Sequence, residues 1–203
     1  MRMGRPDSHI ARRAEMQLRA TSEPSLVNHC LRSHLWGVAL AELEHLDHDP
    51  ELLFVAAALH DLGLVSDFDT GAPFEVDSAA ATHRFALSHD WDGWRAREAG
   101  TAVELHVAPE VTLDHGVEAY LLWHATSIDV SGHRLEELPS ATVTRVLAAH
   151  PWLDFTGHFG QLLGQQAEQK PTSRAGQLVD GGLLTRLAGC PLGHLVPGDL
   201  TGS

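Results

Sequence analysis

The sequence predicts an all-α fold, a single domain built from about eight helices. Three observations support this prediction. Apolar residues recur at the spacing of one helix face in one segment after another. Capping residues followed by proline open two of these segments. No segment shows the strict alternation of apolar and polar residues that is typical of a half-buried strand.

The chain has 203 residues, which is enough for one domain with a substantial core. We expect a polar, arginine-bearing N-terminal arm over residues 1–20, either frayed or a short helix. A helical domain is expected over residues 21–188, followed by a tail rich in glycine and proline over residues 189–203.

The first helix of the domain is predicted from about residue 25 to residue 46. The preceding segment, Thr21-Ser22-Glu23-Pro24, supplies a capping hydroxyl and a proline for the first turn. His29 lies on or beside the apolar stripe of this helix, and Arg32 lies one turn further on. The stripe consists of Leu26, Cys30, Val38, Ala39 and Leu43.

The next helix is predicted from Glu51 to Leu62. Asp49-Pro50 supplies its cap and its first-turn proline, and Gly63 is expected to close it in a left-handed conformation. The run LLFVAAALHDLGL within and after this helix is apolar except for the adjacent pair His60-Asp61.

A turn-rich linker over residues 65–73 precedes the rest of the helices, and Asp77 is expected to cap the first of them. These six helices are predicted over approximately residues 77–89, 92–107, 116–128, 139–149, 155–169 and 175–187.

The composition argues against several functions. The formal net charge of −13 argues against binding to nucleic acid or to an acidic membrane surface, because such binding relies on lysine and arginine to neutralise phosphates. No apolar run is long enough to span a bilayer, and the N-terminus lacks the apolar stretch of a secretory signal, so we expect a cytoplasmic protein. Cys30 and Cys190 form no CxxC pair, so neither a disulfide framework nor a thiolate metal site is expected.

The pair His60-Asp61 ends an apolar helix that should lie in the core. Burying two ionisable side chains next to each other is costly unless a partner satisfies them. A divalent metal ion would satisfy both, because neutral imidazole nitrogen and carboxylate oxygen are good ligands for such ions. The alternative is a histidine near the C-terminal end of a helix, with Asp61 facing solvent.

His29 and Asp129 extend this pattern, because each lies on, or at the end of, another apolar helix. The order His29, His60-Asp61, Asp129 would let four side chains from separate helix positions converge on one ion. A shell of two histidines and two carboxylates leaves coordination positions for water and substrate. We therefore predict a metal site formed by these four residues.

A resemblance to a known family rests on five segments of the chain. They are NHCLRSHLWG (28–37), LLFVAAALHDLGL (52–64), FEVDSA (74–79), ELHVAPEV (104–111) and IDVSG (128–132). Together they resemble the HD-domain superfamily of metal-dependent hydrolases, and are most similar to its branch containing cyanamide hydratase. The resemblance covers roughly residues 25–178.

This resemblance implies a helical domain in which His29, His60, Asp61 and Asp129 hold one metal ion. Cyanamide hydratase uses zinc and adds water to the nitrile-like carbon of cyanamide, which gives urea. Zinc is therefore the expected cofactor here, with iron or manganese as alternatives.

His83 and His106 introduce a two-metal alternative. They follow His60 by 23 and 46 residues, each on its own predicted helix. The order H…HD…H…H…D resembles the two-metal HD sites, in which Asp61 would bridge two ions, and some of these are diiron oxygenases. The other interpretation is that His83 is exposed beside Arg84 and that His106 lines the pocket. Of the two, we favour a single ion.

Each site residue has an expected role. The ion would lower the pKa of its bound water towards about 7, and Asp61 would accept the proton of that water. His106 is expected to donate a proton to the developing anion or to orient the substrate. Arg32 is expected to anchor the substrate or to support the site, with a surface salt bridge as the alternative. Glu75 and Asp77 are candidates to hold a ligand histidine in one tautomer.

The sequence therefore predicts an enzyme, a metal-dependent hydratase or hydrolase for a small polar molecule of the cyanamide or nitrile type. The first alternative is an HD phosphohydrolase for a nucleotide or phosphate ester, which is disfavoured because few basic residues besides Arg32 and Arg84 lie near the motifs. The others are a diiron oxygenase using His83 and His106, and a structural metal or a ligand sensor. The expected partner is a small-molecule substrate, and association into a homo-oligomer is left open.

Overall fold

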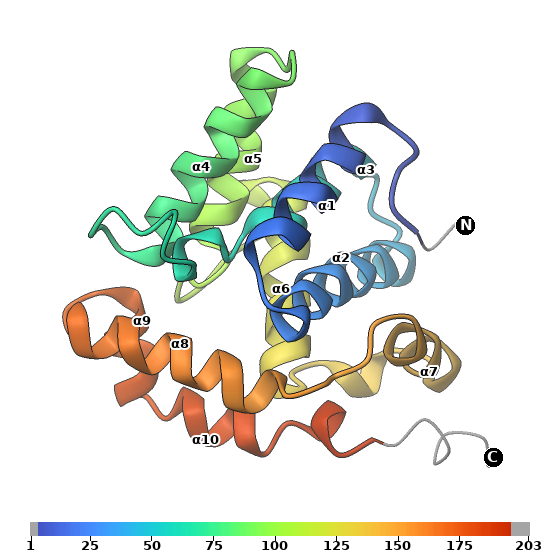
Figure 1. The fold of residues 1–203 in the computed structure, drawn as a ribbon. Helices are drawn as coiled ribbons and strands as arrows, with labels where there is room; N and C mark the ends of the chain where they lie inside the picture. Colours follow the sequence, from blue (N-terminus) through green and yellow to red (C-terminus); the bar gives the residue numbers. More distant parts are fainter. Residues whose placement is uncertain (1–3, 196–203) are drawn as a thin grey trace.

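The computed structural model describes residues 4–195, and all regular elements within this range are helices, as predicted (Figure 1). None of these helices is both long and apolar enough to cross a membrane. The α-helices are α1 (His9–Thr21), α2 (Pro24–Glu44), α3 (Pro50–Leu59), α4 (Phe74–Ser88), α5 (Gly93–Leu105), α6 (Val117–Ser131), α7 (Ser140–Ala149), α8 (Phe155–Gln169), α9 (Arg174–Asp180) and α10 (Leu183–Ala188). The short 3₁₀ helices are η1 (Leu62–Leu64), η2 (Leu113–His115), η3 (Leu135–Glu137) and η4 (Pro191–Gly193).

The centre of the fold is α3, which is apolar on all sides. Its residues from Leu52 to Leu59 are at most 3% exposed. A helix without a polar face is stable only where other elements surround it. Helices α1, α2, α4, α5 and α6 all pack against α3, and α2 is itself buried along most of its length.

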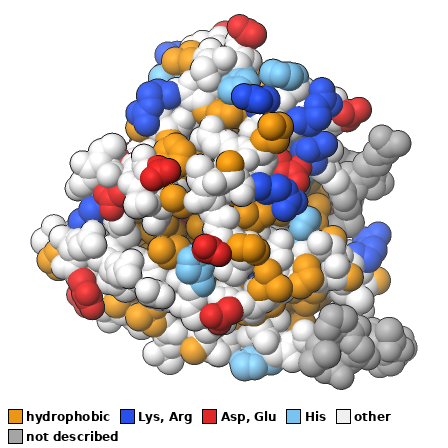
Figure 2. Space-filling model, viewed as in Figure 1, with side chains coloured by type: hydrophobic (Ala, Val, Ile, Leu, Met, Phe, Trp, Pro, Cys, Tyr) orange, Lys and Arg blue, Asp and Glu red, His pale blue; other side chains and the backbone are white. Residues whose placement is uncertain are grey.

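Two further groups of helices flank this core (Figure 1). Helices α4 and α5 pack side by side and extend away from the centre. Helices α8, α9 and α10 form a layer that contacts α2 through α8 and α6 through α10. On the face drawn in Figure 2, hydrophobic side chains gather across the middle, and acidic and basic side chains are interspersed around them.

Two differences raise the number of α-helices in the described range from the predicted eight to ten. The predicted N-terminal arm contains α1, whose Ile10, Ala14 and Leu18 are buried in the core. The helix predicted over residues 175–187 is divided into α9 and α10, because Gly182 takes a left-handed conformation with a φ of 82°.

A capping side chain marks the beginning of α3, whereas α4 begins without one. The side chain of Asp49 accepts hydrogen bonds from the backbone N–H groups of Glu51 and Leu52, as its predicted cap position requires. Helix α4 begins before Asp77, so this residue is not its cap. Asp77 instead accepts hydrogen bonds from the backbone N–H and the hydroxyl of Thr70, which ties the preceding linker to the helix.

Helix α3 ends earlier than predicted, at Leu59 rather than Leu62. The predicted left-handed conformation of Gly63 is wrong, since this residue is not among those with positive φ. A glycine is needed there for another reason. A Cβ at Gly63 would lie 2.1 Å from the carbonyl oxygen of Phe74, and the Gly63 N–H donates a 2.8 Å hydrogen bond to the Ser78 hydroxyl. The backbone just after the pair His60-Asp61 thus packs directly against the backbone at the start of α4.

His34 is a buried polar residue on α2. Its ring lies edge-on to Phe54, with ring centroids 5.0 Å apart. Neither ring nitrogen has a hydrogen-bond partner among the described residues. Because burial disfavours the charged form of an imidazole, it lowers the pKa of His34 to about 4.

We predict that Gly63→Ala lowers the free energy of unfolding by at least about 2 kcal/mol, because the added methyl group would overlap the Phe74 carbonyl. The control is Gly164→Ala on α8, where a Cβ meets nothing within 4 Å. This change should be neutral or stabilising by up to about 1 kcal/mol. Urea unfolding of the two variants checks the prediction, and equal stabilities would contradict it.

We also predict that His34→Leu weakens the dependence of stability on pH. The folded-state pKa of about 4 lies below the ordinary value of 6.5, so the unfolded chain binds more protons between these values. The free energy of unfolding therefore decreases as the pH falls from about 6.5 to 4, and His34→Leu should reduce the loss by about 2 kcal/mol. Urea unfolding at neutral pH and at about pH 4 measures this loss in the wild type and in the variant. The control is His9→Leu, which replaces an exposed histidine. This variant should keep the wild-type dependence of stability on pH.

Candidate metal centre

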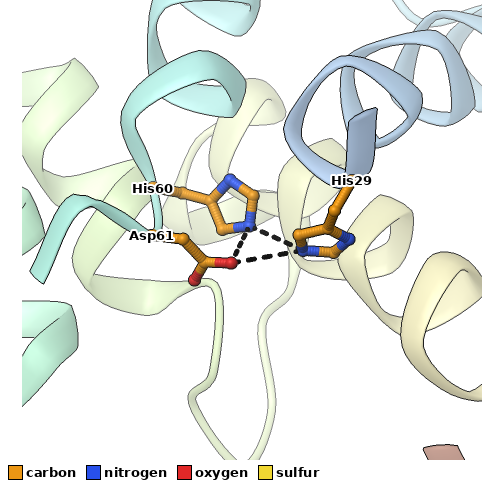
Figure 3. A group of neighbouring side chains, drawn as sticks. All are labelled: His29, His60 and Asp61. Atoms are coloured by element: carbon orange, nitrogen blue, oxygen red, sulfur yellow. Dashed lines mark hydrogen bonds and ion pairs between the residues drawn. The ribbon is translucent and has the colours of Figure 1, made fainter. Parts of the chain in front are cut away.

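Three side chains converge in the interior of the protein (Figure 3). His29 comes from α2, His60 from the C-terminal end of α3, and Asp61 follows directly. The two Nε2 atoms are 3.1 Å apart, and Oδ2 of Asp61 lies 3.3 Å from each of them. All three residues are at most 2% exposed. Within residues 4–195 they are the one group of three or more ligand-type side chains close enough to share an ion.

The other ring nitrogen of each histidine is hydrogen-bonded. His29 Nδ1 lies 2.7 Å from Oδ2 of Asp129, and His60 Nδ1 lies 2.8 Å from the carbonyl oxygen of Ala57. An ionised carboxylate and a carbonyl group can only accept, so each Nδ1 carries the proton of its ring. Each Nε2 therefore directs a lone pair at the point that both rings share with Asp61.

His106 follows the same pattern at the end of α5. Its Nδ1 donates to the carbonyl oxygen of Val103, and its Nε2 lies 3.6 Å from Oδ1 of Asp61. The ring is edge-on to His60 and Phe74, with centroid separations of 4.8 and 5.6 Å. The second oxygen of the Asp61 carboxylate thus faces another unprotonated imidazole nitrogen.

This arrangement fits a divalent cation. Lone pairs that face one another in a dry interior repel, and Asp61 Oδ2 has no hydrogen-bond partner among the described residues. Zinc binds such ligands at about 2.0–2.2 Å, which places neighbouring ligand atoms about 3.0–3.5 Å apart for octahedral to tetrahedral geometry. The observed separations of 3.1 and 3.3 Å lie in that range.

The protonation states suit metal binding. Burial alone would raise the pKa of Asp61, but the positive charge and the N–H groups that His60, His106 and His29 present when their rings are protonated lower it well below its usual range. Burial lowers the pKa of His60, which keeps its ring neutral. Burial opposes protonation of His29 as well, but hydrogen bonds to Asp129 and Asp61 outweigh it and raise the pKa of His29. Protons and a metal ion therefore compete for His29, and metal binding should weaken as the pH falls through that pKa.

Asp129, the expected fourth ligand, does not join the group of His29, His60 and Asp61. Its carboxylate accepts four hydrogen bonds of 2.7–2.8 Å, two from Arg32, one from Trp36 Nε1 and one from His29 Nδ1. Burial alone would raise the pKa of Asp129, but Arg32 and His29 lower it far below its usual range. Because four donors saturate the carboxylate, Asp129 orients His29 and does not face the shared point.

Arg32 lies behind Asp129 and is fully buried, so the surface salt bridge considered above is excluded. Its Nη1 donates to the carbonyl groups of His150 and Pro151, at 3.2 and 3.1 Å. The guanidinium group also stacks on Trp152, 4.8 Å from the ring centroid. Arg32 thereby joins α2, α6 and the segment before α8 in one buried network. It is not among the described residues that line the neighbouring cavity.

The structure does not bring together the two histidines of the two-metal alternative. His106 lies beside Asp61. His83 is half-buried on α4, where it packs against Gly100 of α5. In the described part of the chain, His83 belongs neither to the ligand group nor to the cavity lining.

A cavity of about 370 Å³ opens onto His29, His60, Asp61 and His106. Its walls are mainly apolar and come from α4, α6 and the layer of α8, α9 and α10. Sequence reasoning missed the wall residues on α9 and α10, because no motif or spacing marks them. The remaining lining residues are Phe74, Val107, Ala108, Pro109, Trp123, Thr126, Ser127, Val130, Ser131, His133, Phe159, Leu163, Arg174, Leu178, Leu183 and Arg186.

No protein-family model matches the chain, and no curated protein matches it. The interpretation of the site therefore rests on its geometry and on the chemistry of its residues. The HD-domain resemblance stays a prediction.

We predict that the purified protein binds one divalent ion per chain when loaded with zinc, manganese or iron. His60→Ala and Asp61→Ala should each reduce the bound metal to near zero, because each removes one of three converging ligands. Elemental analysis after gel filtration measures the content, and circular dichroism checks that the variants are folded. His83→Ala is the control and should retain the full content. Two ions in the wild type, with a loss in His83→Ala, would contradict the single-ion site.

Proposed function

We propose that this protein is an enzyme of the HD-domain type, a hydratase or hydrolase that uses a metal-activated water. The supporting observation is the buried convergence of His29, His60 and Asp61 on one point that borders a cavity suited to a small molecule. Three protein ligands beside an accessible cavity are typical of catalytic metal sites, whereas structural zinc sites are closed by four. This difference disfavours a purely structural metal.

The roles of the residues follow from their geometry. His29, His60 and Asp61 would hold a divalent ion, expected to be zinc, which would act as a Lewis acid and lower the pKa of bound water towards about 7. Asp129 keeps His29 in the tautomer whose Nε2 is free to bind. With Nδ1 bonded to a backbone carbonyl group, the neutral ring of His106 has its unprotonated Nε2 close to Asp61. His106 can therefore take a proton from water, the role that the sequence predicted for Asp61, and return it to the product.

A narrower proposal concerns the substrate, a cyanamide-like or nitrile-like molecule to whose carbon water is added. The cavity is larger than cyanamide itself requires, since pockets for drug-sized molecules begin at about 300 Å³. Its walls include the aromatic rings of Phe74, Trp123 and Phe159. These features favour a substrate with an apolar body attached to the reacting group.

Arg174 and Arg186 favour a second candidate, the hydrolysis of a phosphate ester. Arginine is the side chain best suited to clamp phosphate oxygens. The sequence disfavours this reaction because few basic residues lie near the motifs, but the fold brings two more to the cavity from α9 and α10. The two candidates share the metal centre and differ in the product released.

We predict that the zinc-loaded protein converts nitriles to the corresponding amides, or cyanamide to urea. Asp61→Ala should abolish this activity while leaving the protein folded. His106→Gln should lower kcat by about 100-fold or more with the metal content unchanged, because it removes the group that exchanges protons with water. Activity is measured as amide or urea formation by chromatography.

The control variant for this experiment is His83→Gln, which should keep wild-type activity. Nucleotides and simple phosphate esters are assayed in parallel for phosphate release. Phosphate release without turnover of any nitrile would replace the first candidate by the second, and wild-type activity in Asp61→Ala would contradict both.

A further inference from the structure

The cavity beside the metal centre contains a second polar region that the addition of water to a nitrile does not use. Arg174 of α9 is half-buried there. Its Nε donates to the carbonyl oxygen of Val107, the residue that follows His106, and its Nη1 donates to Gln177 at 3.2 Å. Nη2 makes no hydrogen bond to any residue between 4 and 195. The side chain is therefore fixed in place with part of its guanidinium group available.

Arg186 of α10 is the second basic residue of this region. Its Nη1 donates to the carbonyl oxygen of Gly181 at 2.7 Å, which orients an otherwise exposed side chain. A guanidinium group has five N–H donors, so this bond leaves most of them for a ligand. Both arginines line the same cavity as His60 and Asp61.

The charges on the cavity lining are unbalanced. Asp61 is the one carboxylate among the described lining residues, whereas Arg174 and Arg186 each contribute a positive charge. A divalent ion at the metal centre would add two more, so the lining residues of the loaded cavity would carry a net charge of three positive units with the histidines neutral. Glu75 of α4 lies outside the lining but interacts with Arg174, and its charged form would reduce this excess by one unit; burial raises the pKa of Glu75 and so disfavours that form. The whole protein, in contrast, has a net charge of −13. Such a local field in mostly apolar surroundings favours an anionic ligand.

Structural roles explain only part of this arrangement. The bonds to Val107 and Gly181 hold α9 and the start of α10 in position, and each bond uses one N–H group of its arginine. They do not require that both arginines line the cavity. Packing alone would also be served by apolar side chains like the leucines that share this wall, Leu163, Leu178 and Leu183.

We infer that Arg174 and Arg186 form a subsite for an anionic group of the substrate, a carboxylate or a phosphate, distinct from the group that reacts at the metal centre. This inference rests on the proposed function. The substrate class it defines is amphipathic: a reacting group near His60 and Asp61, an apolar body against the aromatic walls, and an anion held by the two arginines.

The test is calorimetric titration with three unreactive probes of matched length: hexanoate, pentyl phosphate and the uncharged hexanamide. We expect at least one anionic probe to bind about tenfold or more tightly than hexanamide. Whichever of hexanoate and pentyl phosphate binds more tightly identifies carboxylate or phosphate as the anionic group of the substrate. Arg174→Gln and Arg186→Gln should each reduce this preference several-fold, and Arg84→Gln, which removes an exposed arginine outside the cavity lining, should leave it unchanged.

Titrations of the metal-free protein separate this inference from the proposed function, since an anion could also bind the metal directly. A preference that depends on the arginines and persists without metal supports the subsite, whether or not nitriles are turned over. A preference that disappears with the metal and ignores both arginine variants overturns it, as does equal binding of all three probes. Arg186→Gln alters an exposed side chain and decides the result if Arg174→Gln does not fold.

Discussion

The buried ion pair between Arg32 and Asp129 is the interaction on which the candidate site depends. Neither residue has exposed surface, and opposite charges are tolerated in the interior only where their hydrogen-bonding groups are satisfied. The pair links α2 to α6, continues to the carbonyl groups that precede α8, and reaches His29 through its Nδ1 proton. Breaking such a pair would leave one charge uncompensated, at a cost of about 3–5 kcal/mol. The orientation of the first metal ligand is thus tied to the stability of the fold.

The other two histidines of the site lie at the ends of helices. His60 and His106 each follow the last residue of a helix, and each donates its Nδ1 proton to the carbonyl three residues earlier. The C-terminal end of a helix carries a partial negative charge, and the contact between the two rings shows that the ends of α3 and α5 meet. Two helix ends therefore add to the attraction that Asp61 exerts on a cation.

The all-α class and most helix boundaries can be predicted because their signals are local: apolar periodicity, capping side chains and prolines. The proximity of His29 to the pair His60-Asp61 can be predicted as well, because apolar helices must pack against one another. The role of Asp129 could not be predicted. A carboxylate binds an ion or orients a ligand according to the hydrogen-bond donors around it, and the donors around Asp129 come from a distant segment, α2. Arg174 and Arg186 carry no local signal either. They reach the cavity only because α9 and α10 pack across it.

The candidate metal ligands lie between residues 29 and 61, whereas the arginines of the cavity wall lie between residues 174 and 186. These two regions belong to separate helices. Within the layer of α8, α9 and α10, Phe155 of α8 stacks on the His29 ring, with centroids 4.5 Å apart, whereas α9 and α10 supply none of the hydrogen bonds that orient His29 and His60. In the proposed enzyme, the residues that react and the residues that select the substrate are therefore encoded in separable parts of the gene. Exchange of α9 and α10 alone could redirect the protein to new molecules, in the laboratory or by natural drift, without rebuilding its chemistry.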